Sequence, residues 1–246
     1  MATDGERYFA SGSTALYAYA KDGTLLASNE TPFEELEKDA NHIGDISVHG
    51  GEIYAGIDLF LDGRAQNIQI AVYDAETLEY RRSIDWNADS GQVNISAVAV
   101  DPDRGAIWTT DWVNGSFLYR YDLGNGAYVD KLHLRPVPQW QQGIAAYRSA
   151  LFLTADDGDA ERHEWDNLWR VVPEEGESAV FVSHERTFDD FRFPGEIEGL
   201  DFDAAAGELV VLANRGKRIV LGMPKGLYPG YESEIHELHV YAVQPP

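Results

Sequence analysis

An apolar strand, a tight turn and a second apolar strand recur four times along the chain, and this repeat limits the possible folds more than any other feature. The four copies align on Ile46, Val98, Ile144 and Leu200, which are 52, 46 and 56 residues apart. A second pattern follows each copy: an alternating strand ending near Tyr-Asp, then a turn and another strand, as in residues 72–78. Self-similarity at such a period indicates a repeat architecture.

Each repeat supplies two hairpins, which together make one four-stranded sheet. Such a sheet has two faces to cover, and neighbouring sheets cover them by stacking around an axis. The sequence therefore predicts an all-β fold, a single β-propeller domain over residues 1–246 with five four-stranded blades; six blades, or an open arrangement, are the alternatives. Because the chain begins and ends within a repeat, we expect the N- and C-terminal segments to close the ring in one blade.

One short helix is predicted at residues 31–34. A threonine N-cap is followed there by proline at the first helical position and by the glutamate of a capping box. These residues lie in a connection between two predicted blades.

The charge balance excludes several classes of partner. The chain has 42 Asp and Glu against 19 Lys and Arg, a net charge of -23, which repels nucleic acid and anionic membranes. Without cysteine, it has no disulfides, thiolate chemistry or sulfur metal ligands. The expected partner is a small-molecule ligand or substrate, with a protein docking on the rim as a further possibility. The N-terminal residues lack signal-peptide features, which fits a cytoplasmic protein or a secreted one with a trimmed signal.

The long connections of the predicted propeller all fall on one face, and this face is where we expect a site. Polar side chains at the starts of the innermost strands and at the ends of the second strands point to it. The alternative is that they bond backbone groups and waters of the channel. The starts carry His42, Asp45, Asn94, Ser96, Gln141, Gln142, Glu196 and Glu198, and the ends carry Asp58, Asp111, Asp156 and Asn214.

This architecture resembles the calcium-dependent propeller hydrolases of the gluconolactonase and paraoxonase group. Glu198-Gly199-Leu200 is similar to the inner-strand glutamate motif of that group, and Asn94 is similar in position to one of its asparagine ligands. The resemblance implies a Ca²⁺ ion held by Asn94, Gln142 and Glu198, which would polarise an ester or lactone carbonyl. The sequence departs from the group at His42 and Gln142, where Asn or Asp is frequent.

The first functional hypothesis is a metal-assisted hydrolase of a small ester, lactone or related substrate. His42 would be the general base, oriented by Asp45 or another carboxylate, although His42 and Asp45 point to opposite sides of a strand. The substrate-binding residues would be Asp58, Asp111, Trp112, Trp140, Asp156 and Asn214.

Two alternatives stay open. Tryptophan and tyrosine on the rim suit a non-catalytic propeller that binds a sugar, a small molecule or a protein. These aromatic residues are Trp86, Trp112, Trp140, Trp165, Tyr228 and Tyr231. The length of the chain and Gln142-Gly143-Ile144 also resemble the five-bladed glutamine cyclotransferases.

Overall fold

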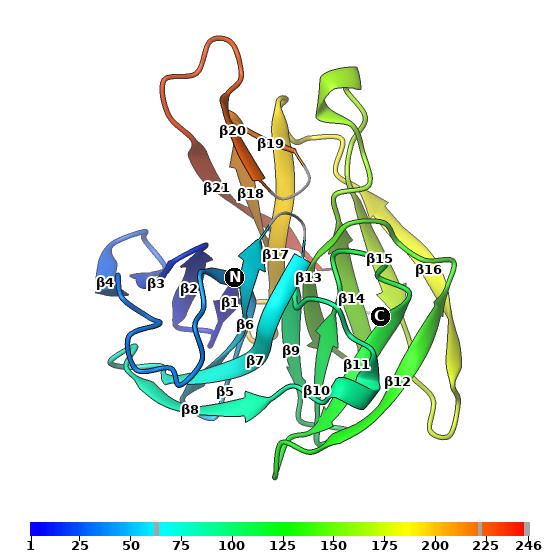
Figure 1. Cartoon of the computed structure of the whole chain (residues 1–246). Helices are drawn as coiled ribbons and strands as arrows, with labels where there is room; N and C mark the ends of the chain where they lie inside the picture. The colour runs from blue at the N-terminus through cyan, green and yellow to red at the C-terminus, as the bar shows by residue number, and fades with distance from the viewer. Residues whose placement is uncertain (62–63, 221–222, 244–246) are drawn as a thin grey trace.

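The computed structural model describes residues 1–61, 64–220 and 223–243, which form a series of small antiparallel sheets (Figure 1). The predicted all-β class is confirmed. Helical structure in these ranges is confined to two three-residue 3₁₀ turns, η1 (Ala88–Ser90) and η2 (Ala160–Arg162). No described helical segment is long and apolar enough to cross a membrane.

Consecutive strands pair in chain order, so each repeat forms a meander. Sheet A contains β1 (Ala2–Thr3), β2 (Arg7–Gly12), β3 (Ala15–Ala20) and β4 (Leu25–Asn29), and sheet B contains β5 (His42–His49), β6 (Glu52–Leu61), β7 (Arg64–Asp74) and β8 (Tyr80–Asp85). Sheet C contains β9 (Ala97–Asp101), β10 (Ala106–Thr110), β11 (Phe117–Asp122) and β12 (Tyr128–Arg135), and sheet D contains β13 (Gln141–Tyr147), β14 (Ala150–Ala155), β15 (Asn167–Val171) and β16 (Ala179–Thr187). Sheet E contains β17 (Gly195–Asp203), β18 (Glu208–Arg215) and β21 (Ile235–Ala242), while β19 (Lys217–Val220) and β20 (Met223–Leu227) form a separate hairpin.

The sequence repeat corresponds to this sheet repeat. The four aligned apolar residues, Ile46, Val98, Ile144 and Leu200, are all buried on the first strands β5, β9, β13 and β17. They are buried on these strands because the first strand of each sheet is covered on both faces by neighbouring sheets.

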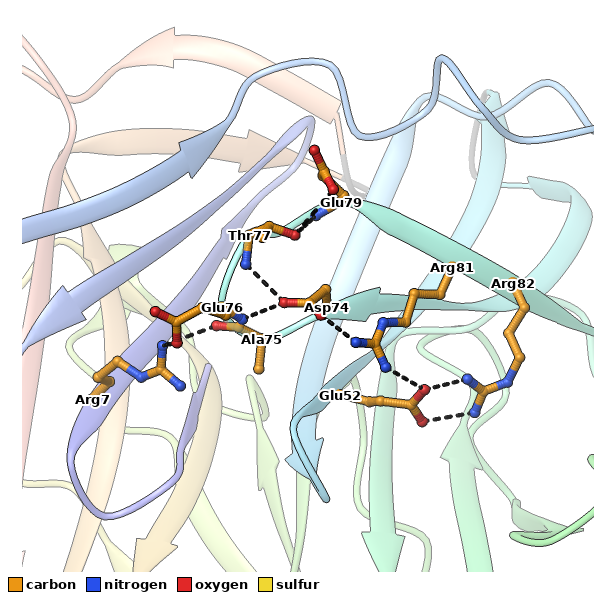
Figure 2. Close-up of polar contacts among 9 residues, drawn as sticks. All are labelled: Arg7, Glu52, Asp74, Ala75, Glu76, Thr77, Glu79, Arg81 and Arg82. Atoms are coloured by element: carbon orange, nitrogen blue, oxygen red, sulfur yellow. Dashed lines mark hydrogen bonds and ion pairs between the residues drawn. The ribbon is translucent and has the colours of Figure 1, made fainter.

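The Tyr-Asp pattern marks the turn after the third strand. In sheet B, the Asp74 carboxylate accepts hydrogen bonds from the backbone N–H groups of Glu76 (2.7 Å) and Thr77 (2.8 Å), which turns the chain toward β8 (Figure 2). Asp122 bonds the N–H groups of Gly124 and Asn125 in the same way in sheet C. An aspartate at this place satisfies backbone donors that the turn would leave unpaired.

Ion pairs connect sheets A and B near this turn. Arg7 of β2 donates to the carbonyl of Ala75 (3.1 Å) and to Glu76 (2.9 Å), so it joins the two sheets (Figure 2). Within sheet B, Glu52 accepts hydrogen bonds from Arg82 and Arg81, and the Arg82 contact lowers the pKa of Glu52 to about 2. The polar groups at this end of the sheets are therefore paired with one another.

The first strands of the five sheets lie side by side. Contacts join β1 to β5, β5 to β9, β9 to β13, β13 to β17, and β17 to β1. Sheets C and D also join at their outer strands, where β12 pairs in parallel with β16 between Leu134 and Val180. This eight-stranded sheet curls until its two ends, β9 and β13, meet, which makes it nearly a closed barrel.

Four hydrophobic clusters fill four of the boundaries between sheets. They include Phe9 and Ile53 between A and B, Tyr54 and Ile107 between B and C, Trp108 and Leu151 between C and D, and Leu168 and Val211 between D and E. Sheets E and A instead meet through polar contacts. Thr3 donates its backbone N–H to Asp201 (2.8 Å), and Lys21 forms an ion pair with Asp203 (3.0 Å).

Asp45 lies at the centre of the arrangement. Its backbone N–H donates to the carbonyl of Ser96 just before β9 (2.8 Å), and its carboxylate accepts a hydrogen bond from the N–H of Ile144 on β13 (3.4 Å). The carboxylate also forms an ion pair with the amino group of Met1 beside β1. On β17, a Cβ at Gly199 would overlap the Asp45 side chain, so glycine is needed for this approach. Burial raises the pKa of Asp45.

Three predictions on the fold are wrong. The terminal segments do not share a sheet, because Ala2–Thr3 pair with Tyr8 and Phe9 and give sheet A its own first strand. A two-residue strand is too short to show alternation. Sheet E has three described strands where four were expected. Residues 31–36 form turns, closed by bonds from Glu34 to Thr31 and from Leu36 to Phe33, and the predicted helix is absent there.

We expect Gly199→Ala to lower the Tm by about 2–12 °C, because overpacking at a fixed backbone costs about 1–3 kcal/mol. Gly12→Ala is the matched control, since its backbone needs no glycine and the nearest atom to a new Cβ is 3.9 Å away. Thermal unfolding followed by circular dichroism measures both. Equal Tm values for the two variants would contradict the close approach of β17 to Asp45.

Candidate functional site

Strand pairing brings the predicted polar residues to one end of the sheets, which we call the site end. His42 at the start of β5 pairs with Asp58 near the end of β6. Glu196 at the start of β17 likewise pairs with Asn214 near the end of β18. Because neighbouring first strands are in contact, residues at their starts come together although they lie far apart in the sequence.

His42 and Asp58 form a hydrogen-bonded pair at the site end. The ring Nδ1 of His42 lies 3.1 Å from Asp58 Oδ1, and the other Asp58 oxygen accepts a hydrogen bond from the N–H of Ile95 (3.3 Å). The Asp58 side chain is buried, whereas 36% of the His42 side chain is exposed. A buried carboxylate thus orients an accessible imidazole, leaving Nε2 free to exchange a proton.

Asp45, the expected partner of His42, lies elsewhere. It contacts Met1, Ile144 and Gly199 at the centre of the sheets, and its carboxylate is almost fully buried. His42 and Asp45 point to opposite sides of β5, as alternation along a strand requires. The structure therefore places Asp45 among the contacts that hold the first strands together, and Asp58 beside the imidazole.

A row of aromatic side chains runs from His42 across three sheets. The ring centroids of His42 and Phe60 are 5.7 Å apart, those of Phe60 and Trp112 are 6.4 Å apart, and those of Trp112 and Trp140 are 4.6 Å apart. We call Phe60, Trp112 and Trp140 the aromatic row. Phe60 was not predicted; its position two residues after Asp58, on the same face of β6, is the signal that could have identified it.

Asp111 and Asn94 hold one part of this row in place. The Asp111 carboxylate accepts hydrogen bonds from the N–H groups of Val93 (3.2 Å) and Asn94 (3.1 Å) and from the hydroxyl of Tyr119 (2.7 Å). Asn94 Oδ1 accepts from the N–H of Trp112 (2.9 Å). Burial raises the pKa of Asp111 to about 6. Both side chains therefore tie the segment before β9 to the end of β10.

Four carboxyl groups lie near each other where sheet D meets sheet E, and we call them the acidic group. They are Asp156, Asp166, Glu196 and Glu198. Asp166, which was not predicted, accepts hydrogen bonds from the N–H groups of Gly158 and Ile197, both at 3.1 Å. It thereby fastens the loop after β14 to β17, and its place in the long loop at residues 156–167 was the available signal.

Burial and mutual repulsion make the members of the acidic group weak acids. Burial is the larger cause and raises the pKa of Glu196 to about 8 and that of Glu198 to about 7. The pKa of Asp166 rises to about 6, and that of Asp156 rises well above its usual range. The amino group of Met1 and, to a smaller extent, His42 oppose this rise in the pKa of Glu198.

The three predicted calcium ligands come from neighbouring first strands or from the segment just before one. Asn94 Oδ1 is already bonded to the Trp112 amide, while Gln142 and Glu198 lie on the adjacent strands β13 and β17. Within residues 1–61, 64–220 and 223–243, no three Asp, Glu or His side chains are arranged to hold a metal ion.

Asn214 lines a small pocket together with Asp166 and Glu196. Its Oδ1 is buried and has no hydrogen-bond partner among the described residues. The pocket has room for about one water molecule. Hydration of this amide would satisfy its unpaired oxygen.

Comparisons with known proteins show the fold alone. No protein-family model matches the chain, and no curated protein matches it. A chain of hydrazine synthase from Kuenenia stuttgartiensis aligns with a TM-score of 0.50 and 13% identity over 87% of this chain, which spans 62% of the length of that chain.

Two further solved structures are less similar. The computationally designed Ika4 protein aligns with a TM-score of 0.40 and 14% identity, over 85% of this chain and 96% of that chain. A chain of the mitotic checkpoint complex aligns with a TM-score of 0.45 and 10% identity, over 85% of this chain and 58% of that chain. None of these names supports the gluconolactonase or cyclotransferase resemblance.

We expect the protein to be more stable at pH 5.5 than at pH 8.5. A carboxyl group whose pKa is raised in the folded state binds its proton more tightly there than in the unfolded chain, so stability grows as the pH falls through the raised value. For Glu196 this window runs from about 8 down to its usual 4.5. Glu196→Gln should raise the Tm at pH 8.5 by about 2–4 °C and leave it nearly unchanged at pH 5.5. If Glu196→Gln raises the Tm equally at both pH values, the raised pKa of Glu196 is contradicted.

Proposed function

We propose that the five sheets form a closed five-bladed propeller whose site end hydrolyses small esters or lactones. The contacts that link β1, β5, β9, β13 and β17 in a cycle support the ring. The hydrogen bond between His42 and Asp58 is the observation that carries the hydrolytic assignment. It supplies an oriented, accessible base beside an aromatic wall, and this is the arrangement that a water-activating site needs.

The mechanism uses the free Nε2 of His42 as general base. A water molecule bound to Nε2 gives up a proton to the imidazole and attacks the substrate carbonyl, while Asp58 stabilises the imidazolium that forms. Collapse of the tetrahedral intermediate breaks the ester bond, and the imidazolium returns the proton to the leaving oxygen. In the absence of Ca²⁺, Glu198, whose pKa burial raises to about 7, can donate a hydrogen bond to the carbonyl oxygen when it is protonated.

The surroundings of His42 select the substrate. The aromatic row offers an apolar wall for the acyl or ring portion of the substrate. The acidic group and the net charge of -23 disfavour an anionic substrate. We therefore expect neutral or cationic esters and lactones to react faster than esters that carry a carboxylate or phosphate.

A second candidate function is ligand binding without catalysis. The aromatic row and the acidic group together suit a ring or an organic cation, because aromatic faces and carboxylates both attract positive charge. Ligand binding replaces hydrolysis as the proposed function if the protein binds such ligands at the aromatic row and hydrolyses none of them.

We expect His42→Ala to lower kcat/KM for aryl esters or lactones by about 10²–10⁴-fold, which is the range for loss of a general base. Glu198→Ala should reduce the rate less. His184→Ala is the matched control, since His184 lies on the outer strand β16 and bonds Asn167 and Thr187 there. A panel of chromogenic esters and lactones measures the rates, and full turnover by His42→Ala would overturn the assignment.

Calcium binding by Asn94, Gln142 and Glu198 stays a prediction, and thermal unfolding tests it. A ligand that binds only the folded state raises the Tm of the protein. At a ligand concentration one hundred times the Kd, the free energy of unfolding rises by about 2.7 kcal/mol. We expect millimolar Ca²⁺ to raise the Tm of the wild type relative to chelator, and Glu198→Gln to abolish the rise. Equal melting curves with Ca²⁺ and with chelator would remove calcium from the proposal.

A further inference from the structure

The outer edge of β21 is an unpaired strand edge. In the described part of the chain β21 pairs only with β18, over eight positions without any register shift. Sheets A and B each have a fourth strand, and sheets C and D cover each other's outer strands through the pairing of β12 with β16. Sheet E is therefore one strand narrower than its neighbours.

The backbone groups that face outward from β21 can be identified. Val243 donates its N–H to the carbonyl of Gly207 (2.8 Å), so the odd-numbered residues of β21 bond to β18. In an antiparallel pair, alternate residues turn both their N–H and their C=O to the other side. His236, Leu238, Val240 and Ala242 therefore direct these groups away from sheet E.

The edge lacks most of the features that normally prevent pairing with another chain, and its one carboxylate, Glu237, is ion-paired with Arg215 of β18. Natural edge strands are protected by proline, lysine, a bulge or short length. The segment Ile235–Ala242 contains no proline, lysine or glycine, and its ladder is regular over its whole length. By contrast, β8 carries Arg81 and Arg82, and β4 has five residues and a register shift.

Apolar side chains beside this edge are exposed. Leu238 and Val240 are 40% and 46% exposed, and Ile235 is also exposed at the start of the strand. Leu238 and Val240 lie on the face of sheet E that points away from sheet D, as their alternation with the half-buried His239 and Tyr241 shows. An added strand would cover part of this apolar surface.

We propose that β21 accepts an extended segment of another protein as the fourth strand of sheet E. The main-chain groups of the even-numbered residues supply the hydrogen bonds, and alternate apolar side chains of the segment cover Leu238 and Val240. The charge of the chain selects the partner: a net charge of -23, with Glu232 just ahead of β21, attracts a segment with lysine or arginine at alternate positions. Two copies of this chain would repel each other.

Fluorescence anisotropy with a labelled synthetic peptide of alternating lysine and valine tests this proposal. We expect saturable binding to the full chain, and no binding of the matched peptide with glutamate in place of lysine. Val240→Pro removes one outward N–H without touching the bonds between β18 and β21, so it should fold and should weaken binding at least about tenfold. Val240→Thr keeps the N–H and should bind within about threefold of the wild type.

Three outcomes would overturn the proposal: absence of binding, equal binding of both peptides, or equal binding by Val240→Pro and the wild type. Sedimentation velocity supplies a fourth such outcome. If the wild type is a dimer and Val240→Pro is a monomer, the occupant of the β21 edge is a second copy of this chain. If Val240→Pro does not fold, Leu238→Lys replaces it. Its positive charge beside the edge should weaken binding of the lysine peptide by a similar factor.

Discussion

The close approach of the five first strands is the constraint on which the rest of the structure depends. Asp45 stands at this point, bonded to residues of neighbouring sheets through Ser96 and Ile144 and packed against Gly199. A buried carboxylate is costly unless its surroundings donate hydrogen bonds to it. Because the donors to this carboxylate, the amino group of Met1 and the N–H of Ile144, come from different sheets, Asp45 is satisfied only when the sheets are correctly arranged around it.

The same constraint builds the site end, where carboxylates of one sheet accept hydrogen bonds from the backbone of the next. Asp58 of sheet B binds Ile95 ahead of sheet C, and Asp166 of sheet D binds Ile197 of sheet E. Both carboxylates hold neighbouring sheets together, and burial also raises the pKa of Asp166 to about 6. Stability and proton chemistry depend on the same contacts.

The edge of β21 shows the opposite situation. Where the sheets meet through hydrophobic clusters, their faces are covered, but sheets E and A meet through Thr3 with Asp201 and Lys21 with Asp203. Polar contacts at a few points leave Leu238 and Val240 uncovered. The chain therefore combines a centre whose buried carboxylate is hydrogen-bonded with one regular, apolar strand edge. An added strand would bond the outward backbone groups of that edge, and this is the physical reason to propose a partner there.

The sequence by itself determined the all-β class, the repeat of four sheets from β5 to β18 and the group of polar residues at one end, because alternation and turn chemistry are local properties. It predicted His42 and Asp58 at that end but not their pairing, and it missed Phe60 and Asp166. Only the tertiary structure decided that Asp58 orients His42, that Asp45 belongs to the centre, and that Ala2–Thr3 form a strand. Each of these depends on contacts between segments far apart in the chain, which no local pattern records.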